Sequence, residues 1–139
     1  TYGSKMLRIL CVQRGETPEE EFILLQNQGV LKVCLTGFML TEESVVRGGR
    51  EPDPSRTFVF WENIWMPPNT YAIVVTGKGE DGWRRCRDGT LVYHAFWNRD
   101  RVVWSTREEP IHLLGIVHTK APEEWQKDPT LVLRGALRR

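Results

Sequence analysis

The sequence predicts an all-β protein, folded as an antiparallel β-sandwich of roughly seven to eight strands. Short apolar runs recur along the chain, and turn-forming Gly, Pro and Asn residues separate them. The 139 residues suit one core, and 40% of them are hydrophobic. We therefore expect one domain over residues 6–119. A tag or disordered start precedes it at residues 1–5, and a short C-terminal extension follows at residues 120–139.

The first strands are expected in the first third of the chain. Met6–Gln13 alternates loosely between its two faces and predicts the first strand. Phe22–Asn27 is apolar on both faces, which is typical of a central strand in a packed sandwich. Leu31–Leu40 follows across the polar-Gly pair Gln28-Gly29, which is a tight-turn signal. These two runs are expected to form a hairpin whose second strand bends at Gly37.

The rest of the chain continues the same pattern of apolar runs and turn residues. Further strands are expected at Arg56–Trp61, Tyr71–Thr76, Leu91–Trp97 and Pro110–His118, the last with a bulge or kink at Gly115. Polar loops are expected at Thr41–Ser55 and Gly77–Gly89. Asn98–Arg101 is expected to be a hairpin turn from which Val102–Trp104 pairs back. In the extension, Pro122–Lys127 predicts a helical turn and Leu131–Leu133 a short strand.

Three short phrases give the chain a family resemblance. Leu25-Gln26-Asn27 ends one predicted strand, and Leu35-Thr36-Gly37-Phe38-Met39-Leu40 crosses the next. Met66-Pro67-Pro68-Asn69 forms a turn in which Asn69 stands where the family usually has Gly, and Asn tolerates the same left-handed backbone. Over residues 6–119 the chain resembles lamin-tail domains, which are small immunoglobulin-like β-sandwiches. The resemblance implies a non-catalytic binding or assembly module that contacts protein or nucleic acid through its loops and needs no cofactor.

Charge and hydropathy exclude several classes of protein. The chain has 19 basic and 18 acidic residues, so its net charge of +1 does not indicate nucleic acid or an anionic membrane. No apolar run reaches the ~18–20 residues of a membrane helix, and no heptad repeat indicates a filament rod. Met6–Val12 is too short for a signal peptide and carries Arg8. We expect no membrane partner, and nothing in the sequence indicates a compartment.

The three cysteines are Cys11, Cys34 and Cys86. They are odd in number and lack a C-x-x-C spacing. Such a set favours reduced thiols, with one disulfide as the alternative. Cys11 and Cys34 lie in predicted strands, where a free cysteine commonly acts as a small buried apolar side chain.

No motif in the sequence indicates a cofactor, a metal or a catalytic centre. Gly77–Gly82 matches G-x-G-x-x-G, but poor helix formers follow it and its acidic residues would repel a phosphate. The three histidines, His94, His112 and His118, lack metal-ligand spacing. Neither the adjacent acidic pairs nor the serines stand in a catalytic context. We expect a protein that is not an enzyme.

Basic and aromatic residues in the predicted loops form the candidate binding surface. We expect a cluster at one end of the sandwich, made of Trp83, Arg84, Arg85, Arg87, Arg99 and Arg101. The alternative is a carbohydrate-binding module that stacks sugars on Trp65, Trp83 and Trp125. Trp61, Trp97 and Trp104 lie in predicted strands, and most of the three are expected in the core. A protein partner or self-association is the first expectation, and nucleic acid and carbohydrate stay open.

Overall fold

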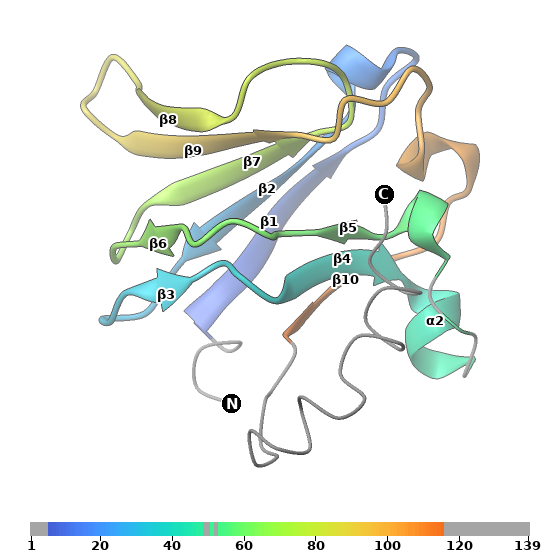
Figure 1. Cartoon of the computed structure of the whole chain (residues 1–139), viewed down its shortest axis with the longest axis horizontal. Coiled ribbons are helices and arrows are strands. Elements are labelled where there is room, and N and C mark those ends of the chain that lie inside the picture. Colours follow the sequence, from blue (N-terminus) through green and yellow to red (C-terminus); the bar gives the residue numbers. More distant parts are fainter. Residues whose placement is uncertain (1–5, 49–50, 52, 116–139) are drawn as a thin grey trace.

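Two layers of β-sheet make up the part of the chain that the structure, a computed structural model, describes: residues 6–48, 51 and 53–115 (Figure 1). The strands are β1 Leu7–Gln13, β2 Phe22–Asn27, β3 Val33–Cys34, β4 Phe38–Glu42, β5 Phe58–Val59, β6 Trp65–Met66, β7 Tyr71–Val75, β8 Gly82–Arg85, β9 Leu91–Phe96 and β10 Ile111–Gly115. The short helices are α2 Glu43–Arg47 and the 3-10 turns η1 Pro18–Glu20, η2 Pro54–Arg56 and η3 Trp104–Thr106. The protein is therefore mostly β and sandwich-like, as predicted.

The larger layer is a five-stranded sheet in the order β1-β2-β7-β9-β8. β2 lies between β1 and β7, which confirms that Phe22–Asn27 is a central strand. All pairs in this sheet are antiparallel except β7 and β9, which run parallel. The chain leaves β7, forms β8 at the edge, and returns as β9 between the two. The predicted antiparallel arrangement therefore fails only at the pair of β7 and β9 among the described strands, because the chain forms β8 at the edge before it returns as β9.

The smaller layer contains a strand pairing that is interrupted midway. β3 pairs with β6, and β4 pairs with both β5 and β10. Between these pairs, the N–H of Gly37 donates to the carbonyl of Phe60 at 3.1 Å. Gly37 has a φ of 90°, a left-handed backbone that glycine adopts without steric cost. This glycine makes the bend that was predicted within Leu31–Leu40.

Asn27 directs the chain from the larger layer to the smaller one. β2 pairs with β1 and β7 and not with β3, so the predicted hairpin across Gln28-Gly29 is wrong. The buried amide of Asn27 instead donates to the carbonyls of Leu31 and Met66 at 2.9 and 3.0 Å. The carbonyl of Asn27 accepts the N–H of Asn69 at 2.8 Å, and Asn69 has the predicted left-handed backbone with a φ of 66°. A buried, fully bonded amide fixes this crossing.

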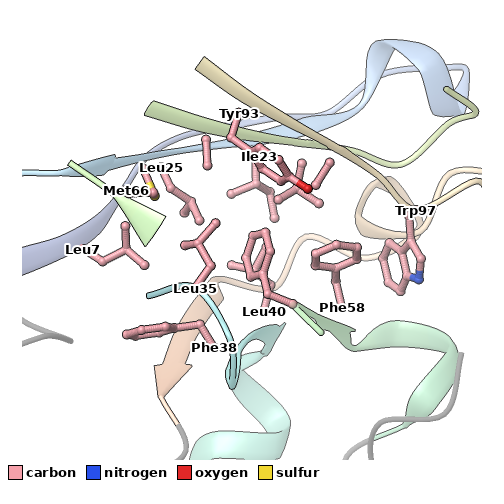
Figure 2. Close-up of a cluster of buried hydrophobic side chains, with 14 of the residues drawn as sticks. Leu7, Ile23, Leu25, Leu35, Phe38, Leu40, Phe58, Met66, Tyr93 and Trp97 are labelled. Atoms are coloured by element: carbon pink, nitrogen blue, oxygen red, sulfur yellow. The ribbon is translucent and has the colours of Figure 1, made fainter. Parts of the chain in front are cut away.

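Apolar side chains from both layers meet in one core (Figure 2). Leu25 and Ile23 point inward from β2, and Leu40 points toward them from β4. Trp97 and Trp104 are buried as predicted and pack against each other with ring centroids 5.3 Å apart.

Trp61 differs from Trp97 and Trp104 in its exposure. It is 49% exposed because it lies just beyond β5, where the strand pairing is interrupted. The prediction that most of these three tryptophans lie in the core is therefore confirmed, with Trp61 as the exception.

Several predicted loops and strands differ from the structure. The predicted loop Thr41–Ser55 contains α2 and part of η2, and the predicted strand Arg56–Trp61 is reduced to the two residues of β5. The predicted loop Gly77–Gly89 contains β8, whose mostly exposed, charged residues pair on one side only and lack an apolar alternation. Val102–Trp104 does not pair back as a hairpin, because the chain turns into η3 there.

The remaining predictions concern the C-terminal strand, the thiols and the two ends of the chain. β10 pairs with β4 in unbroken register up to Gly115, so the described strand has no bulge. The cysteines are unpaired, but Cys11 is exposed rather than buried, since it lies on the outer face of the edge strand β1. No helix that the structure describes is long and apolar enough to cross a membrane. Residues 1–5 and the extension 120–139 lie outside the described residues.

Candidate binding surfaces

The arginines that were expected in one cluster fall into two groups at opposite ends of β9. Arg84 and Arg85 lie on β8 beside the start of β9, and Arg87 lies in the turn between these strands. Arg99 and Arg101 come after the other end of β9. A strand of six residues spans about 20 Å, so Arg85 and Arg87 are separated from Arg99 and Arg101, whereas the side chain of Arg84 extends along β9 to Phe96.

The first group covers the exposed edge of the larger sheet. The Arg84 guanidinium lies over the ring of Phe96, 5.5 Å from its centroid, and Arg85 donates to the carbonyl of Gly89 at 2.8 Å. Trp83 packs edge-to-face on Tyr93 with ring centroids 5.4 Å apart. Charged side chains on an edge strand discourage pairing with another chain. These contacts account for the arginines on β8 without a ligand.

The second group opens into a cavity lined by four arginines, which we call the arginine groove. Arg99 and Arg101 meet Arg56 from η2 and Arg107 from the segment after η3, around a volume of about 500 Å³. The remaining polar lining is Asp53, Ser55 and Asp100. Sequence reasoning missed Arg56 and Arg107, because each is isolated in the sequence and only the fold brings it to Arg99.

The end of β9 holds Arg99 at the arginine groove. The N–H of Arg99 donates to the carbonyl of Thr76 at 2.9 Å. Its guanidinium lies over the ring of Trp97, 4.9 Å from the centroid, and donates to the carbonyl of Ser55 at 2.9 Å. A guanidinium has five N–H donors, so Arg99 keeps donors for a ligand. Arg101 is exposed and makes no hydrogen bond or ion pair with any residue in the described part of the chain.

A buried glutamate, Glu42, lies beneath the arginine groove. It is 2% exposed and accepts two hydrogen bonds from Arg56, at 2.7 and 2.5 Å. These bonds to Glu42 raise the pKa of Arg56. Arg107 donates to the same carboxylate at 3.3 Å. Glu42 therefore positions Arg56 and Arg107 and offsets part of their charge, whereas Arg99 and Arg101 have no such buried partner among the described residues.

A second buried glutamate, Glu21, holds the segment that joins Arg101 to Arg107. Its side chain accepts five hydrogen bonds at 2.5–3.1 Å, from the N–H groups of Val103, Trp104 and Ser105 and the hydroxyls of Thr76 and Ser105. Burial is the largest influence on the pKa of Glu21 and would raise it, but the hydrogen bonds together outweigh burial and lower the pKa. The carboxylate thus fixes η3 from its N-terminal side.

Arg14 holds the same segment from the other end of η3. Its guanidinium donates to the carbonyls of Trp104, Arg107 and Glu109. Glu21 therefore binds N–H groups at the N-terminal end of one short helical turn, and Arg14 binds carbonyls at its C-terminal end. The peptide dipoles favour an anion at the first end and a cation at the second.

The candidate sugar-stacking tryptophans are only partly described. Trp65 on β6 is 52% exposed and Trp83 on β8 is 37% exposed, whereas Trp125 lies outside the described residues. Trp61 is a further exposed aromatic side chain. Each of the three lies at or beside a strand end in the sequence, on β8, on β6 or just after β5.

The other candidate sites have structural explanations. Gly82 begins β8, so the G-x-G-x-x-G motif leads into a strand and not into the helix that a dinucleotide requires. His112 pairs with Glu43 at 2.9 Å, and burial lowers the pKa of His94. His118 lies outside the described residues, among which no group of three His, Cys, Asp or Glu side chains is placed to hold a metal.

No protein-family model matches the chain, and no curated protein sequence matches it. The lamin-tail resemblance therefore rests on the three sequence phrases described above. The function has to be inferred from the geometry of the surfaces.

Proposed function

We propose that the protein is a non-catalytic binding module of the lamin-tail type, an immunoglobulin-like domain whose arginine groove holds the phosphate backbone of a nucleic acid. The observation that carries this proposal is the groove itself. It gathers four guanidinium groups around about 500 Å³, in a chain whose overall charge is nearly balanced. The lining holds four arginines against Asp53 and Asp100, and such a local excess of positive charge favours an anion.

The donors and the size of the arginine groove suit a phosphate backbone. A guanidinium presents paired N–H donors that match two oxygens of a phosphate. Arg99 is stiffened by the Trp97 ring, so it loses less conformational freedom when it binds. The groove exceeds a single phosphate in size and admits a sugar–phosphate unit.

The carboxylates near the groove support a non-catalytic function. Hydrogen bonds from Ser55 lower the pKa of Asp53, and the hydrogen bond and charge of Lys78 lower the pKa of Asp100. Glu42 is bound by Arg56. A general base at neutral pH needs a pKa near 7, and the pKa values of Asp53 and Asp100 are lowered away from that range.

Binding to labelled oligonucleotides at several salt concentrations tests the proposal. We expect saturable binding whose affinity falls with salt, with a log–log slope of about 0.7 for each phosphate contacted on a single strand. A polyglutamate peptide of equal charge is the matched competitor. The proposal fails if the peptide binds more tightly than the oligonucleotide, which would indicate an acidic protein partner, or if neither ligand binds.

A carbohydrate-binding module is the second candidate, because Trp61, Trp65 and Trp83 are each more than a third exposed. Exposed indole rings offer apolar faces to sugar rings. Binding to a glycan array that is unaffected by salt, and that Trp65→Ala or Trp83→Ala removes, would favour this candidate over the nucleic acid.

A further inference from the structure

The outward face of the larger sheet carries apolar side chains where β2, β7 and β9 lie side by side (Figure 1). The two neighbours of Leu24 along β2 are buried in the core, so Leu24 itself faces outward. Leu24 is opposite Ile73 of β7, and Tyr71 of β7 is opposite Val92 of β9. Outward positions in a β-sandwich are usually polar, whereas three of these four are aliphatic and the fourth is aromatic. This face therefore offers an apolar surface to a ligand.

The turn between β8 and β9 adds polar residues beside this surface, and together they border a cavity of about 510 Å³, which we call the outer cavity. Leu24, Tyr71 and Val92 line it from the sheet, and Arg87 and Asp88 line it from the turn. Small-molecule sites commonly measure about 300–1,000 Å³. The outer cavity lies beside the start of β9, whereas the arginine groove follows the end of that strand, so the two are separate sites.

The two charged residues of the turn differ in how far the protein itself occupies them. The carboxylate of Asp88 accepts the N–H of Thr90 at 3.0 Å, and hydrogen bonds from Thr90 lower the pKa of Asp88. The exposed guanidinium of Arg87 makes no hydrogen bond or ion pair with any described residue. The hydroxyl of Tyr71 likewise has no hydrogen-bond partner in the part of the chain that the structure describes. The outer cavity therefore has unused donors beside an apolar surface.

We propose that the outer cavity binds an amphipathic carboxylate, a ligand with one carboxylate group and an unbranched alkyl chain. A guanidinium pairs with a carboxylate through two parallel hydrogen bonds, and the donors of Arg87 are free to make them. The alkyl chain would lie across the sheet from Val92 to Leu24, over two strand spacings or about 10 Å, which an extended eight-carbon chain spans. One negative charge matches one guanidinium, whereas the second charge of a phosphate monoester would meet the carboxylate of Asp88.

Three six-carbon compounds that differ only in their polar heads test the charge requirement. They are hexanoate, hexan-1-ol and hexylammonium. We expect hexanoate to bind with one-to-one stoichiometry, followed by chemical-shift changes at Tyr71 and Val92, and about five-fold more tightly than hexan-1-ol. Hexylammonium should bind most weakly of the three, because its charge matches that of Arg87. Equal binding of the three compounds, or tightest binding of hexylammonium, would overturn the proposal.

Octanoate tests the contact of the alkyl chain with the sheet. It should bind about ten-fold more tightly than hexanoate, because two further methylene groups leave water. An affinity that does not rise from hexanoate to octanoate would overturn the proposal. So would the absence of octanoate binding up to about 20 mM, a concentration at which even a millimolar ligand nearly saturates its site.

Two substitutions separate the polar contact from the apolar one. Arg87→Gln should weaken hexanoate binding about five-fold and leave hexan-1-ol binding unchanged. Val92→Thr keeps a β-branched side chain in the strand and should weaken both ligands about three-fold. Arg85→Gln is the matched control, because Arg85 removes one charge from the same hairpin but pairs with Leu91, faces the opposite side of the sheet and does not line the outer cavity. An equal loss in Arg85→Gln, or no loss of hexanoate affinity in Arg87→Gln or in Val92→Thr, would overturn the assignment.

Discussion

Two buried glutamates hold neighbouring parts of the same loop, and they do so with different partners. Glu21 accepts hydrogen bonds from backbone N–H groups and hydroxyls around η3, and no cation contacts it within the described residues. Glu42 is held instead by the guanidinium groups of Arg56 and Arg107. The arrangement around Glu21 is closed, because all of its partners are N–H groups and hydroxyls inside the protein. The arrangement around Glu42 instead places its two arginines along the arginine groove.

This difference separates charges that build the fold from charges that remain available to a ligand. Both carboxylate oxygens of Glu21 accept hydrogen bonds inside the protein, from Thr76 and from the segment around η3. Arg56 and Arg107 share one carboxylate, and Arg99 is paired only with a carbonyl and a ring. The number of hydrogen bonds that a charged side chain makes within the protein, and not its residue type, therefore indicates whether its charge is available to a ligand.

Removing the charge of Glu21 should give the largest loss of stability. All five partners of Glu21 point a donor at it, so the –NH2 group of a Glu21→Gln variant must face another donor. We expect the free energy of unfolding to fall by about 3 kcal/mol, as for buried donors left without an acceptor. Denaturant unfolding measures this, with Glu20→Gln on the neighbouring exposed residue as the control. A loss below about 0.5 kcal/mol, typical of a surface site, would contradict the closed arrangement.

Breaking the pair of Glu42 and Arg56 should have the next largest effect. Arg56→Gln leaves a buried carboxylate with only its longer contact to Arg107, and we expect a loss of about 2 kcal/mol. The double variant Glu42→Gln/Arg56→Gln should lose less than the sum of the two single variants, because it buries no unpaired charge. Strict additivity in this double-mutant cycle would show that the two side chains are not coupled.

Acid should weaken the fold through Glu21, in addition to other carboxylates. Hydrogen bonds hold the pKa of Glu21 in the folded protein below its ordinary value of 4.5. Its stabilisation is therefore fully present above pH 4.5 and is lost as the pH falls through the lower folded pKa. The free energy of unfolding of the wild type should fall more steeply below pH 4.5 than that of Glu21→Gln. Parallel curves for the two proteins would contradict this role.

Arg101 should contribute least to stability. It is exposed and contacts no described residue by a hydrogen bond or ion pair, so Arg101→Gln is expected to change the free energy of unfolding by less than about 0.5 kcal/mol. Thermal and denaturant unfolding check this expectation. A larger loss would place Arg101 with Glu42 and Arg56 among the charges that build the fold.

Much of the β-structure could be predicted from local patterns. β2, β7 and β9 were predicted almost to the residue, since each is a dense apolar run bounded by turn residues. β8 was missed because an exposed edge strand needs no apolar side chains, and the parallel pairing of β7 with β9 depends on the path of the chain. Asn27 was identified from the sequence as the end of a strand. Its hydrogen bonds to Leu31 and Met66 could not be predicted, because they are set by the tertiary structure.

The candidate site was predicted in part. Arg99 and Arg101 were named from the sequence, but grouping them with Arg84, Arg85 and Arg87 assumed that neighbours in sequence are neighbours in space. Arg56 and Arg107 reach the groove only because Glu42 gathers them from distant segments.

The two arginine groups offer the most direct test of the account. Arg99→Gln/Arg101→Gln and Arg85→Gln/Arg87→Gln each remove two positive charges, at opposite ends of β9. If the arginine groove binds phosphate, the first variant should lose about ten-fold or more in affinity for an oligonucleotide and lower the salt slope by about one to two, whereas the second should lose about two-fold. Equal losses in the two variants, or the larger loss in Arg85→Gln/Arg87→Gln, would contradict the groove as the binding surface.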